Sequence, residues 1–363
     1  MSPLKRTLEI ETTPHLASGR SVEQIMRNVV WALLPTTAFA IYAFGLSALL
    51  TLLTATLSCV VTEHLLCRGG AQRSTVGDWS ATITGLLYGL TLPPGLPLWM
   101  VICGGVIAVA MGKYLFGGLG YNAFNPALVG RAFLQAAFPA AMTTWSPIMA
   151  PERFQSLPSS SFTLPFMAPS YDTVTGATPL ARMKFDQLST DTGDLIMGFT
   201  SGSSGETCAL LIVLGGAWLV FRRMMNWRIP AAILATVAIL SALFHGIDPE
   251  IYPSPLFSLF SGGLMLGAVF MATDMVASPL TSAGVVIYGI LIGVLIVVIR
   301  FWGGMPEGVM YAILLGNAFS PHIDGLIQPR VFGTGKSGTA KRRTGKPGAG
   351  DSPGTSVPQK QKG

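Results

Sequence analysis

Charged side chains are scarce in this sequence. Only 11% of its 363 residues are Asp, Glu, Lys or Arg, whereas soluble domains carry about 25%. Half of the residues are hydrophobic, and apolar runs long enough to cross roughly 30 Å of hydrocarbon recur along the chain. The deficit excludes an ordinary water-bathed domain and indicates an all-α polytopic protein surrounded by membrane lipid.

Metal-ligating residues are equally sparse. The four cysteines and four histidines are scattered, and no CxxC pair occurs among them. Cysteines in or beside apolar segments are typical of small core residues. We therefore predict no metal site, and no iron–sulfur cluster held by this chain alone.

A cleavable signal peptide is also lacking. Residues 1–27 are polar and contain no apolar core of the kind a signal peptide needs. The first hydrophobic stretch begins near Val29, and we expect it to be the first membrane span. The 42 glycines suit close helix packing in a membrane.

The apolar runs predict about ten membrane helices of about 20 residues each. They lie at 27–44, 47–66, 78–93, 97–113, 127–143, 206–221, 229–246, 256–273, 282–300 and 306–320. The chain then divides into a cytoplasmic N-terminal segment (1–26), a first transmembrane repeat (27–143), an outer loop (144–205), a second transmembrane repeat (206–321) and a disordered basic cytoplasmic tail (322–363).

The motif Asn-Ala-Phe-x-Pro occurs twice, at Asn122–Pro126 and Asn317–Pro321. With five predicted spans in each half, this echo favours two inverted repeats, an architecture that many transporters build around broken helices. Chance similarity between Gly/Ala-rich spans is the alternative. The glycine-rich stretch Gly117–Gly120 before the first copy favours an interrupted or re-entrant helix.

The positive charges are distributed unevenly over the predicted topology. With a cytoplasmic N-terminus, 19 of the 23 Lys and Arg fall on the inner side, eight of them in the tail beyond Gly325. This asymmetry follows the positive-inside rule and places the loop 144–205 on the outer, periplasmic face. It also argues against a nucleic-acid partner. The four remaining cations are Arg153, Arg182, Lys184 and Arg300.

The outer loop carries a motif centred on Thr178, whose hydroxyl can be esterified to a phosphate. Gly176 and Ala177 beside it leave room for a ligand or a modifying enzyme at the backbone. The stretch resembles Asp-x-x-(Ser/Thr)-Gly-Ala-(Ser/Thr), the recognition motif of the flavin transferase that joins FMN to a Ser or Thr hydroxyl. Asp172, Thr175, Gly176, Ala177 and Thr178 match its fixed positions. A Thr-rich surface turn is the simpler alternative.

Two further stretches, Gly117–Arg131 and Gly316–Asp324, resemble signatures of the RnfD and NqrB subunits. The resemblance covers about residues 20–330, and the chain length favours RnfD. It implies a urea-transporter-like fold. It also implies that the chain is a subunit of the Rnf ion-translocating oxidoreductase complex in the bacterial inner membrane and is not catalytic by itself. It further implies covalent FMN at Thr178 with no catalytic side chain beyond the flavin, and flavin and iron–sulfur subunits as partners. The resemblance leaves open whether the chain also binds a second, noncovalent flavin such as riboflavin.

Ionisable residues at membrane depth are candidates for an ion path by default. We expect most of those near span ends, including Glu206 and Glu307, to lie at a hydrated interface. Arg131 is expected to extend its guanidinium to the cytoplasmic surface, and contact with a phosphate or a partner is the alternative. The asparagines below could instead satisfy backbone groups of a broken helix. The candidates for a Na⁺ or H⁺ path are Asp78, Asp274, Asn122 and Asn125.

Two other functions compete with the redox subunit. The repeat by itself would suit a passive channel or small-solute transporter without a redox cofactor. A structural assembly subunit with a decayed flavin site is the third interpretation. Bound flavin separates the first function from both alternatives.

Overall fold

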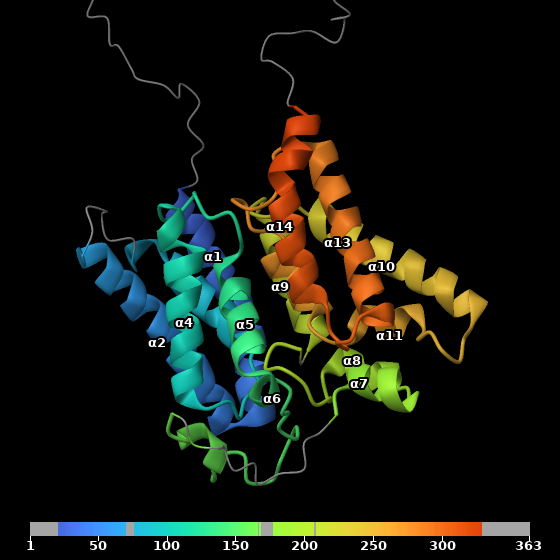
Figure 1. Cartoon of the computed structure of the whole chain (residues 1–363), viewed down its shortest axis with the longest axis horizontal. Coiled ribbons are helices and arrows are strands. Elements are labelled where there is room, and N and C mark those ends of the chain that lie inside the picture. The colour runs from blue at the N-terminus through green and yellow to red at the C-terminus, as the bar shows by residue number, and fades with distance from the viewer. Residues whose placement is uncertain (1–20, 70–75, 166, 168–176, 207, 329–363) are drawn as a thin grey trace, which may run out of the picture. The chain divides into compact units, whose positions relative to one another are not determined.

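The computed structural model describes residues 21–69, 76–165, 167, 177–206 and 208–328, and these residues form helices and turns without a strand (Figure 1). Five helical stretches are long and apolar enough to cross a membrane. This confirms a helical, polytopic membrane protein, while the count of ten crossings stays a prediction. The five are α1 (Val22–Phe44), α2 (Leu46–Gly69), α4 (Leu98–Gly112) with the turn η2 (Tyr114–Phe116), α10 (Arg228–Ile247) and α13 (Ser282–Trp302).

The other elements are shorter. Two of them, α3 (Ser80–Leu90) and α9 (Ala209–Phe221), are apolar helices. The rest are η1 (Val76–Asp78), α5 (Pro126–Ala137), α6 (Pro139–Met142), η3 (Ser159–Phe162), α7 (Pro179–Ala181), η4 (Arg182–Asp186), α8 (Thr192–Met197), α11 (Pro255–Phe260), α12 (Leu264–Leu266), η5 (Gly267–Met271) and α14 (Val309–Leu326).

Helix packing follows the same order in the two halves. In the first half α2 packs against α3 and α4, and α4 packs against α5. In the second half α10 packs against α11 and α13, and α13 packs against α14. Contacts of α1 with α9 and of α5 with α14 join the halves. Two copies of one five-helix unit would give this order.

The chain breaks inside the predicted span 256–273. The helix α11 ends at Phe260, and the chain resumes at α12 after Gly262. Gly262 has φ +67°, in the left-handed region that favours glycine, and so it interrupts the helix. The polar groups at such a break must find partners inside the protein. In the first half of the protein, the last residue of α3 also has an internal partner, because Gly205 N–H donates a hydrogen bond to Leu90 O at 2.6 Å.

The two copies of the Asn-Ala-Phe-x-Pro motif adopt different local structures. The first, Asn122–Pro126, lies in the connection before α5, and Pro126 is the first residue of that helix. The second, Asn317–Pro321, lies within α14. The glycine-rich stretch Gly117–Gly120 belongs to the connection between η2 and α5 and does not interrupt a helix. The echo therefore does not mark equivalent backbone positions.

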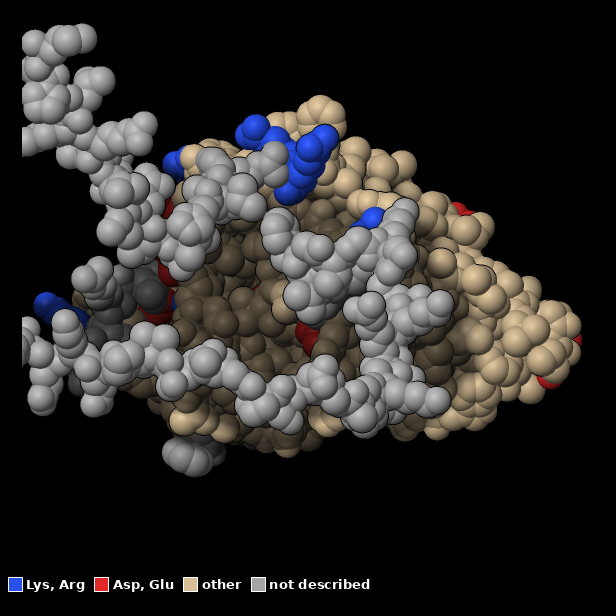
Figure 2. Space-filling model, turned by 90° about the horizontal axis from the view of Figure 1, so that it is seen from above, with Lys and Arg blue, Asp and Glu red and all other residues tan. Residues whose placement is uncertain are grey.

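The start of α1 and the end of α14 lie at one edge of the described structure, the upper edge in Figure 1. The short helices α6, α7 and α8 lie at the opposite edge. Figure 2 looks onto the first edge and shows that this face is hollowed. The segment that begins at Thr178 is therefore remote from the start of α1 and the end of α14.

We expect Gly130→Ala to destabilise the contact between α4 and α5. A Cβ at Gly130 would lie 2.7 Å from Gly104 O and 2.8 Å from the Ala108 Cβ. Overpacking of this kind costs about 1–3 kcal/mol. Thermal unfolding of the purified protein in detergent measures the loss. The control is Gly246→Ala on α10, where a Cβ meets nothing within 4 Å; equal unfolding temperatures for the two variants would contradict this close contact.

Candidate functional site

Thr178 begins the helical segment α7–η4. It is the N-cap of α7, and its Oγ accepts a hydrogen bond from Ala181 N–H at 3.2 Å. Its neighbour Ala177 is exposed, whereas Thr178 itself is 7% exposed. The other motif residues, Asp172, Thr175 and Gly176, lie outside the described residues. The local fold thus presents the predicted attachment residue at the start of a helical turn.

This segment, residues 178–186, is fastened to the second half of the protein. Leu180 and Met183 form a small hydrophobic cluster with Leu195 of α8 and Phe257 of α11. Lys184 Nζ donates to the carbonyl oxygens of Arg300, at 2.8 Å, and of two residues just past α13. These carbonyls lack helical partners, so an ammonium group there is favourable. Partial burial lowers the pKa of Lys184 from its ordinary value.

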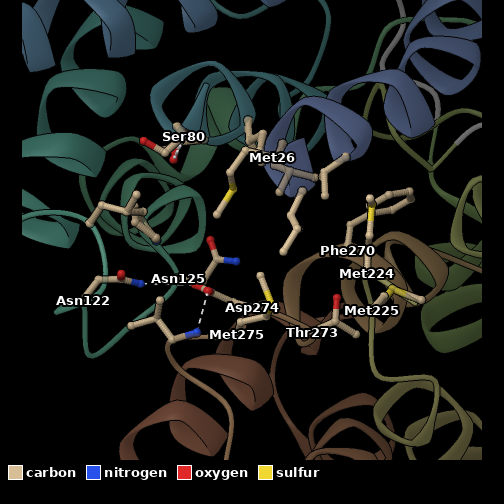
Figure 3. A pocket seen from close by; sticks show the side chains of 18 of the residues that line it. Met26, Ser80, Asn122, Asn125, Met224, Met225, Phe270, Thr273, Asp274 and Met275 are labelled. Carbon is tan, nitrogen blue, oxygen red and sulfur yellow. Dashed lines mark hydrogen bonds between the residues drawn. The ribbon is translucent and has the colours of Figure 1, made fainter. Parts of the chain in front are cut away.

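A second candidate site is the pocket between the halves, which Figure 3 shows from close by. Three of the four predicted ion-path residues line it: Asn122, Asn125 and Asp274. Asn122 Nδ2 donates to Asp274 Oδ2 at 3.2 Å, a contact between residues that are 152 positions apart. Asp274 also accepts from Val276 N–H at 3.1 Å. The fold therefore brings these predicted residues together.

Asn125 has a structural role in this pocket. Its Oδ1 accepts from Ala127 N–H at 3.0 Å and caps α5. Its Nδ2 donates to Met271 O, at the end of the broken helix, at 3.1 Å. This is the backbone-satisfying role that the sequence left open as one of two alternatives. Because Asn125 also lines the pocket, the two roles are compatible.

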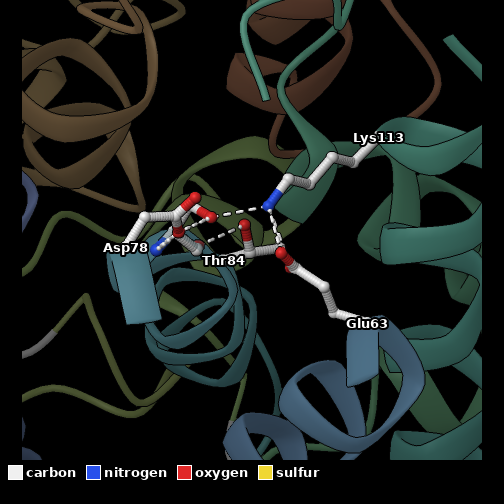
Figure 4. A network of polar contacts seen from close by, with 5 residues as sticks. Glu63, Asp78, Thr84 and Lys113 are labelled. Carbon is white, nitrogen blue, oxygen red and sulfur yellow. Dashed lines mark hydrogen bonds and ion pairs between the residues drawn. The ribbon is translucent and has the colours of Figure 1, made fainter. Parts of the chain in front are cut away.

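Asp78, the fourth predicted residue, does not line the pocket, but it contacts Ser80, which does. Ser80 donates to Asp78 Oδ1 from both its N–H and its hydroxyl, and it also accepts from Lys113 Nζ at 2.5 Å (Figure 4). Lys113 Nζ lies 2.7 and 2.9 Å from the two carboxylate oxygens of Glu63. Sequence reasoning missed this ion pair, although Glu63 is the one acid within the predicted span 47–66.

A third polar cluster lies beside the segment 178–186. Arg131 Nη2 is 2.9 Å from Glu307 Oε2, and Arg131 is 8% exposed. The expectation that Arg131 reaches the cytoplasmic surface was therefore wrong, because a carboxylate inside the protein holds its guanidinium. Glu307 also accepts from Gly263 N–H at 2.6 Å, and Glu206 accepts from the Ser203 hydroxyl at 2.8 Å. Both carboxyl groups thus have partners inside the protein, and their expected place at a hydrated interface stays a prediction.

Arg300 completes this cluster from α13. It is 5% exposed, and its guanidinium donates to Ser258 O at 2.6 Å and to Ser261 O at 2.9 Å. These carbonyls belong to α11 and its end, where the chain breaks before Gly262. Arg300 thus satisfies a helix end at the break. Sequence spacing gave no signal for this arrangement.

Among the described residues no group of three or more His, Cys, Asp or Glu is arranged to hold a metal ion.

Comparison with known proteins gives a consistent result over nearly the whole chain. The model of the NQR2, RnfD, RnfE family matches residues 9–333.

Three relatives are each 40% identical to this chain. The D subunit of the proton-translocating ferredoxin:NAD(+) oxidoreductase complex of Clostridium ljungdahlii aligns over 91% of this chain and 97% of its own length. The D subunit of the Na(+)-translocating ferredoxin:NAD(+) oxidoreductase complex of Acetobacterium woodii aligns over 91% and 96%. The D subunit of the ion-translocating oxidoreductase complex of Stutzerimonas stutzeri aligns over 88% and 94%.

Proposed function

This chain belongs to the NQR2, RnfD, RnfE family, and we propose that it is the D subunit of an ion-translocating oxidoreductase complex and carries FMN on Thr178. The observation that carries the proposal is a complete flavinylation motif in a chain that resembles such D subunits over nearly its whole length. Electrons would pass between partner flavin and iron–sulfur subunits through this group. Ferredoxin is the proposed source of the electrons, because the names of two relatives specify it for those proteins.

The residues around Thr178 fit a phosphoester. The Oγ that accepts from Ala181 N–H keeps a lone pair when it is esterified, so the cap survives attachment. Arg182 lies four residues further along and is exposed, which places a positive charge near the phosphate. Exposed Ala177 leaves the approach open. FMN, when bound, supplies one- and two-electron redox chemistry.

Mass spectrometry of the purified native complex tests this proposal. A peptide that contains Thr178 should carry the mass of one FMN joined through its phosphate. Fragmentation should assign the adduct to Thr178 and not to Thr173 or Thr175 in the same motif. An unmodified peptide from a complex that was expressed with an active flavin transferase would contradict the proposal and favour the decayed-site alternative.

The proposed topology has both termini in the cytoplasm and the loop 144–205 in the periplasm of a bacterial inner membrane. The charge asymmetry supports it, and it survives the removal of Arg131, which lies inside the protein. The position of α6 to α8 opposite the start of α1 and the end of α14 fits this orientation. The matching helix order in the halves supports two inverted five-helix repeats of the urea-transporter-like kind.

The pocket between the halves suits a second, noncovalent flavin such as riboflavin. Apolar side chains, among them Met26 and Phe270, line it with a few amide and carboxylate groups, the usual composition of a cofactor pocket. Asn122, Asn125 and Asp274 would offer the polar contacts. Extraction of flavin from the Thr178→Asn chain, separated from its partner subunits, tests this placement, because neither Thr178 nor a partner flavin subunit can then supply the released flavin. The same pocket would line the path in a passive solute transporter, which predicts solute flux in liposomes without bound flavin.

We expect Asp274→Asn to lower coupled ion transport by about tenfold, equivalent to about 1.4 kcal/mol. The substitution removes the carboxylate that faces Asn122 in the pocket and keeps its shape. Ion uptake into proteoliposomes during electron transfer measures the effect, first with Na⁺ and then with H⁺. Asp194→Asn, at an exposed position of the helix α8, is the control. If Asp274→Asn and Asp78→Asn both leave coupled transport intact, these carboxylates are not carriers.

A further inference from the structure

Glu206 and Glu307 bring two carboxyl groups together from different parts of the chain. Glu206 lies in the turn before α9, and Glu307 lies in the turn before α14. A Cβ at Gly263 would lie 2.7 Å from Glu307 Oε1 and 3.9 Å from Glu206 Oε1, so the two carboxyl groups border the same small space. Two ionised carboxylates that share a site repel each other, and this repulsion favours a proton on one of them.

The surroundings of the two carboxyl groups are unequal. Glu307 accepts from Gly263 N–H at 2.6 Å and pairs with the Arg131 guanidinium at 2.9 Å. Glu206 accepts from a neutral donor, the Ser203 hydroxyl, at 2.8 Å. Because a cation and a backbone donor both stabilise an ionised carboxylate, Glu307 is the charged partner and Glu206 carries the proton.

The charges around the pair favour a proton over a metal ion. Arg131 from α5 and Arg300 from α13 are both more than nine-tenths buried. A Cβ at Gly262 would lie 3.3 Å from Arg300 Nη2 and 3.3 Å from Glu307 Oε1, so both groups border the same small space. Tyr311 of α14 faces Arg131 as a further titratable group. Two guanidinium groups repel a metal cation, which would also need several ligands, whereas a proton binds covalently to one carboxyl oxygen.

A small cavity adjoins the pair and has an unsatisfied donor in its wall. Arg131, Ser203 and Glu307 line this cavity. Among the described residues, Arg131 Nε has no hydrogen-bond partner. Buried donors of this kind are normally satisfied by ordered water. A water in this cavity would reach both the Arg131 guanidinium and the Glu307 carboxylate.

We propose that Glu206 and Glu307 form a proton-binding site that is separate from the Thr178 segment and from the pocket between the halves. Glu206 takes one proton from water and returns it to water, and no electron moves in this step. Without the proton, two carboxylates balance Arg131 and Arg300. With the proton, the site carries one net positive charge.

The site lies directly against the segment 178–186. A Cβ at Gly262, which borders Glu307, would lie 2.6 Å from Leu180 Cδ1. On the other side, Lys184 Nζ holds the carbonyl oxygen of Arg300. A positive charge here stabilises added negative charge nearby. Proton binding therefore favours reduction of a flavin on Thr178, a consequence that rests on the proposed function.

Infrared difference spectroscopy on the purified complex, titrated with pH, tests the site itself. The wild-type complex should show a protonated-carboxyl C=O band that disappears as the pH rises. Glu206→Gln should lack this band, and the exposed control Glu250→Gln should retain it. The measurement is repeated in a Thr178→Asn complex, which has no flavin at that position. A Glu206→Gln spectrum identical to that of the wild type overturns the proposal.

A second variant keeps the proposal testable if Glu206→Gln does not assemble. Ser203→Ala removes a donor that stabilises ionised Glu206. The midpoint of the same infrared titration should therefore move to higher pH. An unchanged midpoint overturns the assignment of the band to Glu206.

Redox titration of the covalent flavin tests the link to the Thr178 segment. In the wild type and in Glu250→Gln, the dependence of the flavin midpoint potential on pH should change slope at the pH where the infrared band titrates. Glu206→Gln should lose this change of slope. If the band titrates and the slope does not change, the link is overturned while the proton site stands. If Thr178 carries no flavin, the proposed function fails and the infrared result still decides the proton site.

Discussion

Replacement of Thr178 by Val is expected to remove covalent flavin from this chain completely. Valine has nearly the shape of threonine but has no hydroxyl to esterify. The loss is all-or-none because the bond needs that oxygen. Fluorescence of the chain in a denaturing gel under ultraviolet light measures it, since only covalent flavin survives denaturation. The expected result is no fluorescent band at the mass of this chain.

Two further substitutions at Thr178 separate chemistry from folding. Valine also removes the acceptor for Ala181 N–H, and loss of an N-cap costs about 1 kcal/mol. Thr178→Asn retains a capping acceptor without a hydroxyl, so it should assemble and lack flavin. Thr178→Ser retains both the cap and the hydroxyl, and it should fluoresce. Fluorescence in the Asn variant would show that flavin is attached elsewhere and would rule out Thr178 as the site.

Replacement of Lys113 by Met is expected to destabilise the protein by about 3–5 kcal/mol, the usual cost of breaking a buried ion pair from one side. The side chains of Lys113 and Glu63 are 5% and 3% exposed, and their closest atoms lie 2.7 Å apart. Without the ammonium, the Glu63 carboxyl group loses its cation among apolar helices, and Ser80 loses the donor at its hydroxyl. Thermal unfolding in detergent, at one scan rate for all variants, measures the effect.

The double variant Lys113→Met/Glu63→Gln is the control for this prediction. It removes both charges, so the uncompensated carboxylate disappears and much of the lost stability should return. If the double variant is as unstable as the sum of the two single variants, the residues contribute independently. That outcome would contradict a direct ion pair between α2 and the end of α4.

Helix positions and the candidate attachment residue could be identified in the sequence for local reasons. The predicted spans 229–246 and 282–300 match α10 and α13 within two residues, because an apolar run of that length is itself the signal. The motif at Thr178 is contiguous, so its residues needed no fold to be recognised. The span 256–273 was less accurate, because apolarity does not register the helix break that Gly262 allows.

The polar clusters were decided by tertiary structure alone. Asp274 and Asn122 were singled out separately, and only packing of the halves sets them 3.2 Å apart. Arg131 was assigned to a surface because nothing near it in the sequence could neutralise it, while its partner Glu307 lies 176 positions away.

The sequence by itself thus determined the membrane class, the helices and the candidate flavin residue, since each depends on neighbouring residues. Which buried charges meet depends on how broken helices from the two halves pack, because each charge in a low-dielectric interior needs a partner that the local sequence does not supply.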